Sequence, residues 1–232
     1  MKYIFTLLFI LWGSKAYMQI VLNEGKIFYE ITYGNLSPEM KRQEHLMPHD
    51  ASFYFKNEKT RFEMGLGGLG KNTTIYNRSK RENTILLVIQ GKRFALIKSD
   101  SEMMLAHKSL TPYDSNNRFL RVEVLDEYKK IAEKNCRKAI VYRSVNGKDQ
   151  ASECWFTKEI PPYNTINDPN LKDLDGFLMQ YNITENGMTM NMRVKMVMGI
   201  PIEDEMFAIP AGYQVVTEQE LMRLLMVMGQ EK

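Results

Sequence analysis

A run of methionines near the C-terminal end of the chain is the sequence feature with the most distinctive chemistry. Within residues 188–198 (MTMNMRVKMVM) the apolar even positions are Met188, Met190, Met192, Val194, Met196 and Met198. Because side chains alternate between the two faces of a β-strand, this pattern predicts a strand with all of these side chains on one face. Flexible, polarisable thioethers suit a surface that accepts varied apolar shapes. We therefore expect this row to line a binding site for a lipid, a lipoprotein tail or an apolar peptide.

Two other interpretations of the run stay open. A packed core face would show the same alternation without holding any ligand. Thioethers also select Cu(I), and Met188, Met190 and Met192 at two-residue spacing would bring three sulfurs together on one side. Copper sites of this kind usually add a histidine or a cysteine, and nothing in the sequence places one beside this strand. The leading hypothesis therefore includes no metal and no cofactor, with Cu(I) binding or a purely structural envelope subunit as the alternatives.

The N-terminal residues 1–16 have the order of a secretory signal peptide. A short basic start precedes a ten-residue apolar run, YIFTLLFILW, and small residues stand at Ser14 and Ala16. Ten helical residues cover only about half of the roughly 30 Å hydrocarbon core of a bilayer, which argues against a permanent anchor. We expect cleavage after Ala16, a periplasmic or secreted protein with outer-membrane association as one alternative, and no transmembrane span afterwards.

Cys136 and Cys154 are the two cysteines of the chain, and in an oxidising compartment one disulfide is the default expectation. They flank a predicted hairpin with a tight turn at residues 146–147. That turn would place Cys154 opposite Ala139 on one face and leave Cys136 on the other face. A disulfide needs Cβ atoms about 3.8 Å apart, so the bond requires a longer loop or a bulge.

Motifs for catalysis or nucleotide binding are incomplete. Residues 65–71 (GLGGLGK) match a glycine-rich phosphate loop, but such loops require a following helix and residues 73–76 (TTIY) predict a strand. An enzyme would need a cleft that joins His107 to the acidic loop at 160–176. The near balance of 31 basic and 28 acidic residues argues against a nucleic-acid partner. We therefore expect a binding protein that is not an enzyme.

The rest of residues 17–232 predicts one antiparallel β-rich domain. About ten alternating segments are separated by polar turns, and the continuously apolar residues 85–89 (ILLVI) predict a central strand covered on both faces. A C-terminal amphipathic helix is predicted over 217–228, with a capping box at its start. Its apolar stripe is Leu221, Leu224, Leu225 and Met228. The pattern predicts an α+β, mainly antiparallel fold with two or three helices on one side of the sheet.

Several segments resemble a family of exported Bacteroidota proteins known as domain of unknown function 4412. They are GKIFYEITYGNLSPEMK, FYFKNEKTRFEM, the GLGG loop, CRKAIVY…CWFTKEIPP and ITENGMTMNMRVKMV…FAIPAGY. Residues 174–178 (LDGFL) also bear a looser likeness to the GLPGLI family. The resemblance implies a curved, half-barrel sheet similar to that of the lipoprotein carriers LolA and LolB and the sensor RseB. The resemblance implies no catalytic residues. The methionine row, together with the fold-level likeness to lipoprotein carriers, predicts an apolar ligand, a lipidated protein or another envelope protein as the partner.

Overall fold

The computed structural model describes residues 21–65, 70–103, 117–145, 147–163, 171, 174–185 and 188–230. The first six strands are β1 (Glu24–Gly34), β2 (Asp50–Lys56), β3 (Lys59–Gly65), β4 (Lys71–Asn77), β5 (Glu82–Ile89) and β6 (Lys92–Ser99). The later strands are β7 (Asn117–Ile131), β8 (Lys134–Val145), β9 (Lys148–Thr157), β10 (Phe177–Glu185), β11 (Met188–Met198) and β12 (Gln214–Val215). The helical segments are α1 (Pro38–Arg42), η1 (Glu44–Leu46), η3 (Asp204–Phe207) and α3 (Glu218–Gln230).

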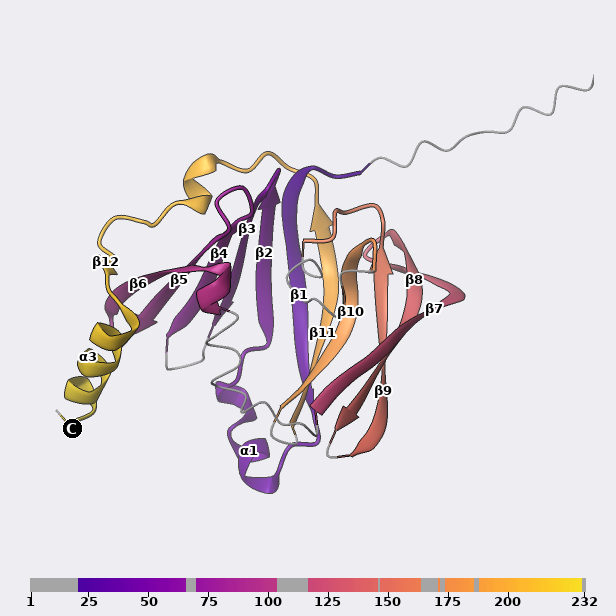
Figure 1. Cartoon of the computed structure of the whole chain (residues 1–232), viewed down its shortest axis with the longest axis horizontal. Coiled ribbons are helices and arrows are strands. Elements are labelled where there is room, and N and C mark those ends of the chain that lie inside the picture. The colour runs from indigo at the N-terminus through magenta and orange to yellow at the C-terminus, as the bar shows by residue number, and fades with distance from the viewer. Residues whose placement is uncertain are drawn as a thin grey trace, which may run out of the picture.

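All the described strands join one open sheet in the order β12-β6-β5-β4-β3-β2-β1-β11-β10-β9-β8-β7 (Figure 1). Every neighbouring pair is antiparallel except β12 and β6, which run parallel. The mainly antiparallel α+β class is therefore confirmed, with 12 strands rather than about ten. The two-residue strand β12 is too short to leave a periodic signal in the sequence.

The sheet bends around the face that carries Ile27, Tyr29, Ile31 and Tyr33 of β1, which we call the concave face. The ring centres of Phe53 on β2 and Phe177 on β10 lie 5.3 Å apart, although β1 and β11 separate their strands. In a flat sheet, strands three positions apart lie about 14 Å apart. These aromatic side chains reach over β1 and β11 and close the concave face between β2 and β10.

Helical segments cover both faces of the sheet at β5, rather than one face as expected. Directly paired residues on neighbouring strands lie on the same face of the sheet. Phe53 pairs with Phe62, Phe62 with Thr74 and Thr74 with Ile85, so all four lie on the concave face. On that face α3 packs against the odd-numbered residues of β5: Ile85, Leu87 and Ile89. On the opposite face Leu86 packs against Phe207 of η3 and the segment that follows it. Residues 85–89 thus form a strand covered on both faces, as predicted, but β5 is the third strand from the β12 edge of the sheet and not a central one.

The start of α3 also follows the sequence prediction. Thr217 accepts a hydrogen bond from the backbone N–H of Glu220, and the Glu220 carboxylate accepts from the backbone N–H of Thr217, which is a capping box. Of the predicted stripe, Leu221, Leu224 and Leu225 pack against β5 and β6, and the side chain of Met228 lies outside the described residues. None of the described helices is long and apolar enough to cross a membrane.

A β-bulge in β11 divides the methionine row between the two faces. The predicted strand spans the expected residues, and Val194 pairs with Tyr29 of β1. The next pair along β1 is Phe28 with Met196, so Lys195 is an extra residue without a partner on β1. An extra residue reverses the side-chain alternation that follows it. The expectation that the whole row shares one face is therefore wrong from Met196 onward.

The consequences for burial follow directly from the bulge. Met192 and Val194 lie on the concave face and are only 1% and 2% exposed, whereas Met196 is 47% exposed. Val197 pairs with Ile27 and takes the core-facing position after the bulge, and Met198 faces outward with Met196. The buried residues of this core are Ile27, Tyr29, Ile31, Ala51, Phe53, Phe55, Ile131, Cys136, Trp155, Ile160, Phe177, Met179, Met192 and Val194.

This division makes a direct prediction for stability. We expect Met192→Ala to lower the free energy of unfolding by about 2–5 kcal/mol, because it leaves a cavity in a filled core. Met196 lies further along the same strand, on the opposite face. Met196→Ala should change the free energy of unfolding by less than about 0.5 kcal/mol. Urea unfolding followed by circular dichroism measures both. Equal losses in the two variants would show that both methionines are buried and that the bulge is misplaced.

Candidate binding site on the concave face

At one end of the concave face the apolar side chains are only partly covered, and we call this end the open end. It consists of Tyr33, Met64, Ile183, Met188 and Met190. Tyr33 pairs with Met190 across β1 and β11, and Ile183 pairs with Met190 across β10 and β11. The alternation along β11 places Met188 on the same face as Met190. Four of these side chains are half-buried and Ile183 is 37% exposed, so this end offers apolar surface to solvent.

Two tyrosines give the open end a fixed frame. The Tyr33 hydroxyl donates to the carbonyl oxygen of Pro48 at 2.7 Å, and the His49 ring lies edge-on to the Tyr33 ring at 6.3 Å. Burial, followed by the nearby Glu44 carboxylate, raises the pKa of Tyr33. Tyr181 packs edge-on against Tyr29, and burial raises its pKa to about 12. Both hydroxyls are therefore neutral at physiological pH, and the rings act as apolar walls.

The predicted row of ligand-lining residues is thus only partly brought together. Met188 and Met190 lie at the open end, and Met192 and Val194 form a closed floor beneath the concave face. Met196 and Met198 lie on the opposite face. For the copper alternative, Met188, Met190 and Met192 share the concave face. Among the described residues no group of three or more His, Cys, Asp and Glu side chains is arranged to hold a metal ion.

Among the described residues, one enclosed pocket is small and one larger depression is open to solvent. One pocket lies at the other end of the concave face, between β3, β4 and residues 161–163, and has a volume of about 20 Å³. That volume holds about one water molecule and is far too small for an acyl chain. A second depression, of about 440 Å³, is open to solvent beside β6 and β12, where Lys92, Arg93 and Gln214 line it. Neither of these two spaces lies at the open end, whose apolar side chains are only partly covered.

Comparison with known proteins places this chain in a family. Residues 34–213 match the family described as a domain of unknown function (DUF4412). This chain belongs to the DUF4412 family. No curated protein matches its sequence significantly. Among solved structures, that of PNGF-II is similar with a TM-score of 0.47 and 16% identity, covering 88% of this chain and 32% of that one.

A second solved structure, the crystal structure of LprF from Mycobacterium bovis, is similar with a TM-score of 0.34 and 10% identity. This match covers 82% of the DUF4412 chain and 90% of LprF. The DUF4412 chain spans about a third of the length of PNGF-II. Neither likeness reaches a TM-score of 0.5, so no functional conclusion follows from either one.

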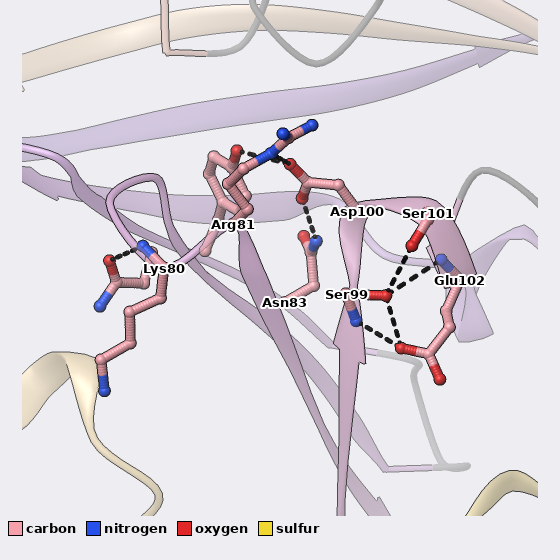
Figure 2. A network of polar contacts seen from close by, with 9 residues as sticks. Lys80, Arg81, Asn83, Ser99, Asp100, Ser101 and Glu102 are labelled. Carbon is pink, nitrogen blue, oxygen red and sulfur yellow. Dashed lines mark hydrogen bonds and ion pairs between the residues drawn. The ribbon is translucent and has the colours of Figure 1, made fainter.

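A polar network closes the end of the sheet beside the small pocket of the DUF4412 protein (Figure 2). The Asp100 carboxylate accepts hydrogen bonds from Tyr76 at 3.3 Å, Arg81 at 3.4 Å and Asn83 at 3.0 Å. Burial and the Asp100 charge raise the pKa of Tyr76. With both of its oxygens engaged, Asp100 ties the ends of β4, β5 and β6 together and is better suited to structure than to proton transfer.

The two cysteines of the DUF4412 protein are free thiols, and the expected disulfide is wrong. Cys154 pairs with Ala139 across β8 and β9, as the sequence predicted. Cys136 lies three residues before Ala139 on β8, so it faces the other side of the sheet and joins a different apolar cluster. The hairpin has the tight register and no bulge between these strands. A bond across the sheet is therefore sterically impossible in this register.

Two other sequence expectations, the signal peptide at residues 1–16 and the role of His107, lie outside the described residues. So does most of the 160–176 loop. Sequence reasoning missed Tyr33 and Ile183 as members of the open end. Their alternation within β1 and β10 was readable, but the pairing of β11 with β1, which brings Tyr33 beside Met190, joins segments far apart in the chain.

The buried thiols lead to a prediction about reactivity. Burial raises the pKa of Cys136 to about 11 and the pKa of Cys154 to about 12. Since a thiolate is the reacting form, neither thiol should react with a disulfide reagent such as DTNB in the native protein at about pH 8. Both should react after unfolding in denaturant, which restores the ordinary pKa of about 8.5. Rapid labelling of either cysteine in the native state would contradict the register of β8 and β9.

Proposed function

We propose that this DUF4412 chain is a binding protein without enzymatic activity that holds an apolar group against the open end of its concave face. The group is a lipid acyl chain, the lipid tail of a lipoprotein or an apolar peptide segment. The observation that carries the proposal is the half-buried pair Met64 and Met190 beside Tyr33, above a packed floor. This arrangement leaves apolar surface partly in water, which costs free energy unless a ligand covers it.

The chemistry of the open end supports a ligand of variable shape. Methionine side chains have three rotatable bonds and adapt to irregular apolar partners at little cost. The tyrosine walls are held by the hydrogen bond from Tyr33 to Pro48 and by the packing of Tyr181. A rigid frame with adaptable side chains inside it favours binding of several related apolar groups over strict recognition of one.

Localisation is part of the same proposal. We propose that residues 1–16 direct export and that the mature protein acts in the periplasm or at the cell envelope, where acyl chains and lipidated proteins are available. The apolar run at residues 3–12 supports export. Mass spectrometry of the protein recovered from its host would find the chain beginning at residue 17 if this is correct.

The binding proposal is tested by a matched pair of variants in β11. Met190→Lys places a charge at the open end, and Met196→Lys places the same charge on the opposite face of the same strand. With a fluorescent fatty acid as the probe, we expect Met190→Lys to weaken binding about tenfold or more, because a charge in an apolar contact costs at least about 1.4 kcal/mol. Met196→Lys should leave the affinity within about twofold.

Native mass spectrometry of the protein purified from its host provides an independent measurement. Co-purifying acyl species in the unmodified protein, and their loss in Met190→Lys, would support the proposal. If no acyl species co-purifies and the probe does not bind, or if both lysine variants lose affinity equally, the open end is not a lipid site. Circular dichroism of each variant establishes that the fold is retained.

A further inference from the structure

The surface formed by β7–β11 holds a lysine in an unusual setting. Lys129 belongs to β7, where it pairs with Cys136 of β8. Its side chain extends across the neighbouring strands, so that Nζ lies 4.0 Å from the centre of the Trp155 ring and donates to Oε1 of Gln180 at 3.0 Å. The ammonium group contacts the indole face on one side and the amide oxygen on another. These two contacts fix its position on the surface of the sheet.

A second cation lies beside the first. Arg193 of β11 is the direct cross-strand partner of Gln180, the residue that binds Lys129. Within the described part of the chain, neither Lys129 nor Arg193 has a carboxylate within 4.0 Å. By contrast Lys195, two residues further along β11, forms an ion pair with Glu30 at 3.2 Å.

Three acidic residues near this pair already have partners. One is Glu30 of β1, the direct cross-strand partner of Arg193, and its carboxylate forms an ion pair with Lys195 at 3.2 Å. Glu127 and Glu153 both bind the ammonium group of Lys138 at 3.0 Å. Glu153 also accepts the indole N–H of Trp155. In the part of the chain that the structure describes, these ion pairs neutralise Lys138 and Lys195 and leave Lys129 and Arg193 without a salt-bridged carboxylate.

Electrostatics show that the arrangement is costly for Lys129. Burial lowers the pKa of its ammonium group, the Glu153 carboxylate opposes this effect in part, and the charges of Arg193 and Lys138 lower the pKa further. A protein that fixes a partly desolvated cation beside another cation carries an unfavourable interaction. An anion placed between the two would turn this repulsion into attraction.

We propose that Lys129, Gln180 and Arg193 form a binding site for a phosphate group, either free in solution or in the headgroup of a lipid. The guanidinium group supplies a planar pair of donors that fits a phosphate or carboxylate, the ammonium group supplies a point charge, and the amide nitrogen of Gln180 supplies a further donor. Arg193 lies between Met192 and Val194 in β11, so it faces away from the concave face. The site is thus separate from the open end and goes beyond the function proposed for it.

Trp155 supplies the readout for a test. The chain has two tryptophans, Trp12 and Trp155, and a chain that begins at residue 17 retains only Trp155. Because the ammonium group of Lys129 lies over its ring, an anion that binds Lys129 should change the emission of Trp155. Titration of the chain from residue 17 onward with inorganic phosphate, against sodium chloride at matched ionic strength, measures binding of the free anion. Vesicles of phosphatidylglycerol, against vesicles of phosphatidylcholine alone, measure binding of an anionic lipid headgroup.

We expect a saturable change in at least one of the two titrations. Lys129→Met, which keeps an apolar stem over Trp155, and Arg193→Gln should each weaken it about tenfold or more, as expected for the loss of a charge-assisted hydrogen bond. The control Lys59→Gln on β3 removes an equally positive residue that pairs with Asp204 at 3.4 Å, and should change the affinity by less than about twofold.

The outcomes separate the two sources of phosphate. Saturation with inorganic phosphate alone assigns the site to a free anion, and saturation with anionic vesicles alone assigns it to a headgroup. The proposal is overturned if neither titration saturates, or if Lys59→Gln weakens binding as much as Arg193→Gln does. Arg193 is exposed, so its substitution tests the site even if Lys129→Met were to destabilise the fold.

Discussion

The pairing of β1 with β11 is the contact on which the rest of this structure depends. Strands β1 to β6 follow one another in sheet order, as do β7 to β11, and β1 and β11 join these two groups edge to edge. The seam links residues 26–34 with residues 189–198, so its formation requires closure of a loop of more than about 150 residues. The buried pairs Tyr29 with Val194 and Ile31 with Met192 supply the apolar contact that offsets this entropy cost.

The same seam decides which apolar side chains reach solvent. At its centre the concave face is closed by aromatic residues from β1, β2 and β10, which meet across the bend of the sheet. Towards the Tyr33 end the cover thins, and Met64 and Met190 are left half-buried. A filled centre with a partly open end differs from the continuous ligand-lining row that the methionine pattern predicted. It directs the search for a ligand to a surface of the DUF4412 protein and not to an internal cavity.

The two faces of β11 differ in chemistry because of where the chain places its charges. The concave face presents thioethers, whereas the outer face presents Arg193 beside the Lys129 and Gln180 pair. The outer arrangement draws one residue from each of three strands, β7, β10 and β11. It exists only because the sheet brings these strands close enough for the side chain of Lys129 to reach Gln180.

The sequence by itself determined the local features of this protein. The spacing in residues 188–198 predicted a strand, the turn at 146–147 predicted the register of Cys154, and residues 217–225 predicted a capped helix with one apolar side. Each follows from a repeat of two or 3.6 residues, which neighbouring residues define. The disulfide prediction failed because it came from the expected compartment and not from the geometry of the hairpin.

Only the tertiary structure decided which methionines are buried and which cations stand together. The bulge at Lys195 arises where β11 pairs with β1, a strand from the opposite end of the chain. The spacing within residues 188–198 does not predict it. The bulge moves Met196 and Met198 to the outer face and leaves Met188 and Met190 at the open end. Alternation is a property of a single strand, whereas the register between two strands depends on the packing of both. Which side chains of β11 face the core is therefore decided only by its pairing with β1.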